Sequence, residues 1–228
     1  MSAMNDRRIP YRQVVALLLL SGAVPWVTTG RAAVRPSFTG SQEMKMNVGV
    51  GPGAPTDIGV FFAQVDVAFV GTFDHATVEF VDVEAGKLRT RMFFRPTNVI
   101  KGSVSTASSG AFEVLTPGGS YVETPAGLRP LRPIEAAEQL PFGTVCFVAA
   151  ARIEWPGSPV DGKYRLMGPE TLVRIAGAQV SPVRGESDWF DAMMAHARRM
   201  ASTATAGATV DDATAFLAAM RQAAGQPR

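Results

Sequence analysis

The chain of 228 residues contains one cysteine and two histidines. Because Cys146 is the only thiol, no internal disulfide can form. His75 and His196 stand far apart, and no His-x-x-x-His or Cys-x-x-Cys pair supplies the ligands that zinc needs. No loop places acidic residues in the alternating pattern that calcium needs. We therefore expect neither a metal site nor a bound cofactor.

Sequence signatures of covalent catalysis and phosphate binding are missing as well. No serine lies in a Gly-x-Ser-x-Gly turn, and the Thr-Pro-Gly-Gly segment at 116–119 lacks the Lys-Ser/Thr pair of a phosphate loop. His75, directly after Asp74 between two strand-like runs, is the one candidate general base, although a polar turn histidine is the simpler interpretation. We interpret Cys146 as a small core residue and His196, on a Met-rich helical stripe, as a residue packed in the core or at its boundary.

Excess positive charge is confined to the N-terminal region. The whole chain has a net charge of +2, but residues 1–32 hold four of the 22 basic residues and one of the 20 acidic residues. The remainder, with 18 basic and 19 acidic residues, is therefore close to −1. No cluster of lysines and arginines is left to neutralise a row of phosphates, so we expect no nucleic-acid partner.

Residues 1–32 have the pattern of a secretory signal peptide. A polar head with three arginines precedes an apolar run over 14–27, and small residues follow at 30–33. The run is shorter than the ~20 residues that cross a bilayer. We predict cleavage near Ala32, with Gly30 as the alternative and an uncleaved anchor still open. Cleavage would leave no integral span in a periplasmic or extracellular protein. The single cysteine and the absence of Asn-x-Ser/Thr sites favour a bacterial source.

Three regions follow the leader. Residues 33–56 are rich in glycine and proline, and we expect a flexible segment there. Residues 57–183 carry short strand-like runs separated by turn signals, a pattern typical of a small barrel or sandwich. Residues 187–224 have helical periodicity and predict two helices. These helices either pack across the open side of the β-domain or form a separate hairpin for a partner.

Several elements within these regions have clear signals. We expect a short helix over 57–65 capped by Asp57 or the residue before it, and a helix beginning after Ser187. Thr209 and Asp212 suggest a capping box for the last helix. The predicted strands span 67–72, 76–83, 87–94, 97–100, 111–115, 144–153, 164–167 and 172–175. Residues 120–140, punctuated by prolines, form a long excursion from this pattern.

A hairpin is predicted where two of these runs flank Ala85-Gly86. Its second strand alternates polar and apolar residues. The polar residues either keep an exposed face solvated and discourage edge pairing, or form a binding surface. The candidate binding residues on this strand are Lys87, Arg89, Arg91, Phe93 and Arg95. The Met-rich C-terminal helices are a second candidate contact surface.

Four stretches, at 63–72, 98–102, 114–119 and 140–148, occur in the order of a first strand, a Val-Ile-Lys-Gly strand end, a Thr-Pro-Gly-Gly turn and an apolar strand. Together they resemble a loosely defined family of exported bacterial proteins with an OB-like barrel, similar in layout to netrin-like and tissue-inhibitor-of-metalloproteinase modules. The resemblance covers about residues 57–180. It implies a mainly β fold with a small OB-like barrel. Animal inhibitors of this type carry disulfides and a metal-binding N-terminal cysteine, which this chain lacks.

These observations favour an exported, non-enzymatic binding module with a protein partner in the cell envelope. One alternative is a hydrolase that uses His75 as its base, with a serine or carboxylate nearby. Another is an inhibitor of an exported protease, which would present residues 118–133 as a projecting loop. Fold resemblance alone does not choose among them.

Overall fold

The computed structural model describes residues 43–46, 53–84, 86–204 and 210–225. Contacts divide the chain into two units, Met1–Phe38 and Thr39–Arg228, and all described residues belong to the second. The expected signal peptide, its cleavage site at Ala32 and the capping residue Thr209 lie outside the described residues. The described part is mainly β, with a large sheet and two C-terminal helices.

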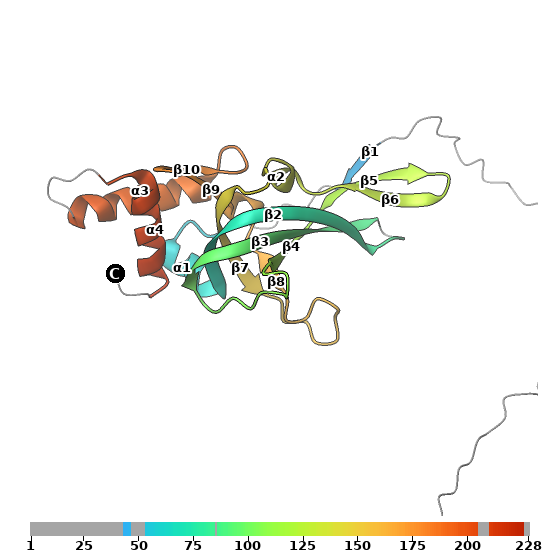
Figure 1. Ribbon diagram of the computed structural model, residues 1–228, viewed down its shortest axis with the longest axis horizontal. Helices are drawn as coiled ribbons and strands as arrows, with labels where there is room; N and C mark the ends of the chain where they lie inside the picture. The colour runs from blue at the N-terminus through green and yellow to red at the C-terminus, as the bar shows by residue number, and fades with distance from the viewer. Residues whose placement is uncertain (1–42, 47–52, 85, 205–209, 226–228) are drawn as a thin grey trace, which may run out of the picture. The chain divides into compact units, whose positions relative to one another are not determined.

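The larger sheet has the strand order β10-β9-β7-β2-β3-β4-β8 (Figure 1). Its strands are β2 (Val67–Asp82), β3 (Lys87–Lys101), β4 (Phe112–Pro117), β7 (Val145–Arg152), β8 (Tyr164–Leu166), β9 (Val173–Ala176) and β10 (Gln179–Pro182). Strand β8 pairs in parallel with β4 and antiparallel with β7. A circuit of pairings therefore runs from β7 through β2, β3, β4 and β8 back to β7.

A smaller antiparallel sheet has the order β1-β5-β6. Its strands are β1 (Glu43–Met46), β5 (Gly119–Thr124) and β6 (Gly127–Arg132), and the short helix α2 (Glu135–Glu138) follows. These elements occupy the excursion expected at 120–140, and β1 falls inside the segment expected to be flexible. Phe80 of β2 packs edge-on against Tyr121 of β5 at 5.8 Å between ring centroids, so the tip of the β2–β3 hairpin contacts the smaller sheet.

The longer helices begin at side-chain caps. They are α1 (Ile58–Gln64), α3 (Asp188–Ala204) and α4 (Asp212–Ala223), and a single 3₁₀ turn spans Pro169–Thr171. Asp57 accepts from the Val60 amide at 2.8 Å and Ser187 from the Phe190 amide at 3.1 Å, which confirms both predicted caps. Helix α4 is capped by Asp211, whose carboxylate accepts the amide of Thr214, the third residue of the helix, at 2.8 Å. The predicted capping box, which placed Asp212 at the third helical position, was wrong, because Asp212 is the first residue of the helix.

Strands β2 and β7 are buried on both faces over their paired segment, because each contributes alternate side chains to two apolar clusters. The inner cluster contains Val67, Phe69, Met92, Phe94, Phe112, Cys146, Val148 and Ala150 among others. The outer cluster joins Ala68, Val70, Phe147 and Ala149 to Phe61 of α1, Trp189 and Met193 of α3, and Phe216 and Met220 of α4. The C-terminal helices therefore pack on the sheet and do not form a separate hairpin.

Strand β2 is continuous where the sequence predicted two strands and a turn at His75. The register passes from Phe73 opposite Phe94 to His75 opposite Phe93, which makes Asp74 the extra residue of a bulge. A one-residue insertion reverses the alternation of side chains. Phe73 is accordingly buried before the bulge, and His75 is exposed after it. The prediction of a turn was wrong because Asp74 and His75 lie at a bulge, and the strand continues beyond them.

Candidate functional site

The outer face of the β2–β3 hairpin carries all five candidate binding residues. The residues between them, Leu88, Thr90, Met92 and Phe94, are buried. Because side chains alternate along a strand, the candidates share the opposite face. Lys87 and Arg95 are exposed, while Arg89, Arg91 and Phe93 are half-buried. The alternation in the sequence thus identified one continuous surface.

Arg89, Arg91 and Arg95 on this face are paired with carboxylates from neighbouring strands. Arg89 Nε donates to Glu79 at 2.9 Å, and Arg91 binds Glu113 with Glu79 as a second partner at 3.6 Å. Lys163 Nζ lies 3.4 Å from Glu113 on its other oxygen. The hydrogen bond with Glu113 raises the pKa of Arg91, against the opposing effect of burial. The surface is therefore an alternating charge lattice in which all three arginines already have carboxylate partners.

An aromatic platform lies within this lattice. The His75 ring stacks on the Phe93 ring with centroids 4.4 Å apart and planes at 14°. The Arg91 guanidinium carbon lies 5.3 Å from the Phe93 centroid, a cation–π distance. His75 and Phe93 are cross-strand partners. The platform follows from the bulge, because the bulge moves His75 onto the outer face.

The bulge also places Asp74 beside His75. His75 Nδ1 lies 3.1 Å from Asp74 Oδ2, and Arg95 Nη2 forms an ion pair with the other carboxylate oxygen at 3.2 Å. An imidazole held by a carboxylate is one part of a hydrolytic triad. Among the described residues, however, no hydroxyl or thiol is hydrogen-bonded to His75, whose side chain is 53% exposed. The geometry supplies a base and its orienting group without a bonded nucleophile.

The remaining chemically interesting residues lie elsewhere in the fold. Cys146 is fully buried, and burial raises the pKa of its thiol to about 12, only partly opposed by Arg174. Its interpretation as a core residue agrees with this position. His196 lies in the middle of α3, is partly buried, and lines a cavity with Asp57. Within the described ranges, no group of three or more His, Cys, Asp or Glu side chains could hold a metal ion.

The Thr-Pro-Gly-Gly segment joins two strands, and the backbone of Gly118 is hydrogen-bonded within the protein. Gly118 donates its amide to Leu88 and accepts from the Thr90 hydroxyl. A Cβ on Gly119 would come within 2.6 Å of Val78. The segment therefore redirects the chain from β4 into β5. Strand β5 then forms a hairpin with β6.

The two other candidate surfaces, the Met-rich C-terminal helices and the segment 118–133, differ in exposure. Met193, Met194 and Met220 are buried in the outer cluster, so the apolar stripe of the C-terminal helices is not a contact surface. The segment 118–133 forms the β5–β6 hairpin, whose tip exposes Pro125 and Ala126. A projecting segment thus exists at the position that the protease-inhibitor hypothesis requires.

Sequence reasoning missed the acidic partners of the face, namely Asp74, Glu79 and Glu113. A regular hairpin with its turn at Ala85-Gly86 would not pair Glu79 with Arg89. The two residues are paired in the structure because the register shifts by one residue between Phe80 and Asp82. The one available signal was the alternation of Thr77, Glu79 and Val81 after the polar pair.

No helix in the described part of the chain has the length and apolar character needed to cross a membrane. The chain matches no family model, no curated protein and no solved structure. Its function must accordingly be argued from the geometry of its own residues.

Proposed function

We propose that this protein is an exported, non-enzymatic binding module and that the outer face of β2 and β3 contacts a protein partner in the cell envelope. The single observation that carries the proposal is the preorganised platform of His75, Phe93 and Arg91 within a balanced charge lattice. Aromatic and arginine side chains dominate the energetics of protein interfaces. Fixed ion pairs select a partner by complementary charge more than they add affinity.

We further propose that the five strands in the circuit of pairings form an OB-like barrel. Support comes from the parallel pairing of β4 with β8 and from α2, which lies in the chain between β4 and β7. The same circuit agrees with the resemblance to netrin-like modules. Export rests on the leader pattern of residues 1–32. Mass spectrometry of the protein from periplasmic and culture fractions tests this part, since a mature N-terminus near Ala33 is expected and intact Met1 in the cytosol would contradict it.

Site-directed photo-crosslinking tests the binding surface. A photoreactive residue in place of Thr77, on the outer face, should capture the same envelope protein in repeated preparations. Phe93→Ala should abolish this product, because the platform loses its centre. Trp155→Ala is the matched control: it removes a 66% exposed aromatic side chain outside the β2–β3 face and should leave the product unchanged. Equal yields from both variants would contradict the proposed surface.

The Asp74–His75 hydrogen bond favours a second candidate function, hydrolysis with His75 as the base. Such an enzyme would hydrolyse a generic ester, and His75→Ala would remove this activity while the protein stays folded. Asp74→Asn would reduce it by impairing the orientation of the imidazole. Absence of turnover in the wild-type protein, or unchanged turnover in His75→Ala, would eliminate this candidate.

A further inference from the structure

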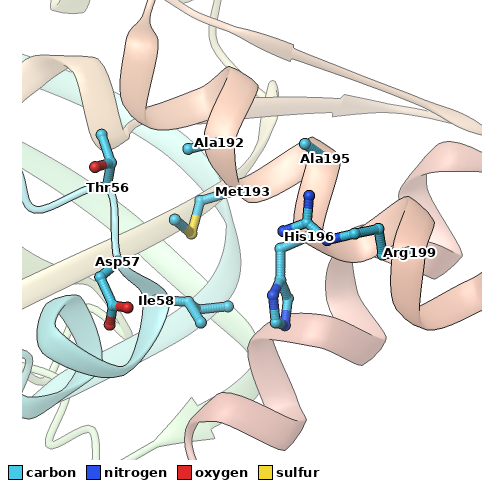
Figure 2. Close-up of a pocket in the computed structure, with 8 residues that line it drawn as sticks. All are labelled: Thr56, Asp57, Ile58, Ala192, Met193, Ala195, His196 and Arg199. Carbon is cyan, nitrogen blue, oxygen red and sulfur yellow. The ribbon is translucent and has the colours of Figure 1, made fainter.

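A cavity of about 280 Å³ lies between the start of α1 and one face of α3. Figure 2 shows it lined by Thr56, Asp57, Ile58, Ala192, Met193, Ala195, His196 and Arg199. Ile58, which is partly exposed, gives the middle of the cavity an apolar surface, and the fully buried Met193 lies in the wall. None of these residues belongs to the β2–β3 face, so a ligand here would be independent of the proposed function.

The two basic side chains of the cavity lie at one side of it (Figure 2). Neither Arg199 nor His196 has a side-chain hydrogen bond or an ion pair with any described residue. The preceding residue, Arg198, differs: it forms two hydrogen bonds with Asp212, of 3.2 and 2.9 Å. Unused guanidinium donors beside an apolar surface suit a carboxylate, which accepts charge-assisted hydrogen bonds.

The opposite side of the cavity carries Thr56 and Asp57 (Figure 2). One oxygen of Asp57 already accepts the Val60 amide at 2.8 Å as the cap of α1. Its negative charge disfavours a second anion at this side. The cavity is therefore electrostatically asymmetric, with a guanidinium and an imidazole at α3 and a carboxylate at α1.

We propose that this cavity binds a small amphipathic monocarboxylate. Its carboxylate is held by Arg199 and His196, and its hydrocarbon part lies over Ile58. A volume of about 280 Å³ lies at the lower end of small-molecule sites, so the ligand must be small. The uncharged end of the ligand points toward Asp57, which excludes a dicarboxylate of equal length.

Calorimetric titration of the full chain with octanoate tests the site. We expect saturable binding to the wild-type protein, at least tenfold weaker binding of octanol, which lacks the charge, and of suberate, which places a second carboxylate near Asp57. Arg199→Gln should weaken octanoate binding about tenfold. Arg198→Gln, the matched control, should leave it unchanged, because that guanidinium is committed to Asp212. Ala192→Leu should abolish binding by filling the cavity.

Thermal unfolding of each variant shows whether it is folded, and Arg199 is exposed, so its substitution should not change the melting temperature. Three results would overturn the proposal: no octanoate binding at millimolar concentration, equal affinity for octanol and octanoate, or equal losses in Arg199→Gln and Arg198→Gln. The crosslinking experiment on the β2–β3 face remains interpretable in every case, because it uses different residues.

Discussion

The two halves of strand β2 belong to one continuous strand, but they differ in how far their side chains are buried. From Val67 to Phe73 the strand is covered on both faces, and nearly every side chain is buried. From His75 to Asp82 one face is covered and the other carries the charge lattice. The change falls at the Asp74 bulge. A single inserted residue thus separates a stretch that is buried on both faces from one that exposes a charged face.

The largest effect should come from breaking the doubly covered half. Phe147, on the neighbouring β7, contacts Phe216 at 5.3 Å and Trp189 at 6.5 Å between ring centroids. Phe147→Ala should lower the free energy of unfolding by about 3–5 kcal/mol. Phe93→Ala, on the open half, should cost about 1 kcal/mol, since its contacts are partly solvated. Urea denaturation measures both, and equal losses would contradict the distinction.

The next effect concerns the end of β3 beside the buried half. Gly102 has φ of +71°, and a Cβ there would lie 2.2 Å from the Asp66 carbonyl oxygen. Gly102→Ala should therefore destabilise the protein by about 3 kcal/mol or more, combining backbone strain with a clash. Gly110, with φ of +74° and nothing within 4 Å, is the control for strain alone, at about 1–2 kcal/mol. Similar melting temperatures for the two variants would argue against the close approach.

The buried thiol gives a pH-dependent test of the same region. The unfolded chain releases the Cys146 proton from about pH 8.5 upward, whereas the folded protein holds it to about pH 12. The free energy of unfolding should fall as pH rises through this window, by up to about 1.4 kcal/mol per pH unit from this group. Cys146→Ala should show a shallower decline in urea denaturation. Parallel pH profiles would contradict burial of the thiol.

The smallest effect should come from the charge lattice. A double-mutant cycle of Arg91→Gln and Glu113→Gln should give a coupling of about 0.5–1 kcal/mol, because both side chains are partly exposed. The coupling should shrink as salt increases. Denaturation at low and high ionic strength measures it. A coupling that does not depend on salt would indicate that the pair is more deeply desolvated than the structure shows.

Local patterns predicted the elements whose causes are local. The caps at Asp57 and Ser187, the alternation along β3 and the apolar run of β7 all depend on residues close in sequence. These features can therefore be recognised in the amino-acid sequence itself. The mainly β character and the two C-terminal helices followed from the same signals.

Features that depend on distant partners were not predictable. Strand β1 exists through pairing with β5, and β6 tolerates Pro130 because it lies at the edge of its sheet. The Asp74 bulge is defined only by the register with β3. The candidate residues on β3 were found, but their acidic partners on β2 and β4 required that register. The role of the C-terminal helices was likewise undecided until their apolar stripes met the sheet.

The shared use of β2 and β7 has a consequence for dissecting the protein. Both strands form a common wall between the two apolar clusters, so loss of one cluster removes support from the other. A shortened protein ending before Ser187 would expose Val70, Phe147 and Ala149 to water and should aggregate. Helices α3 and α4 cannot serve as a detachable arm, and heating should melt sheet and helices in one cooperative transition.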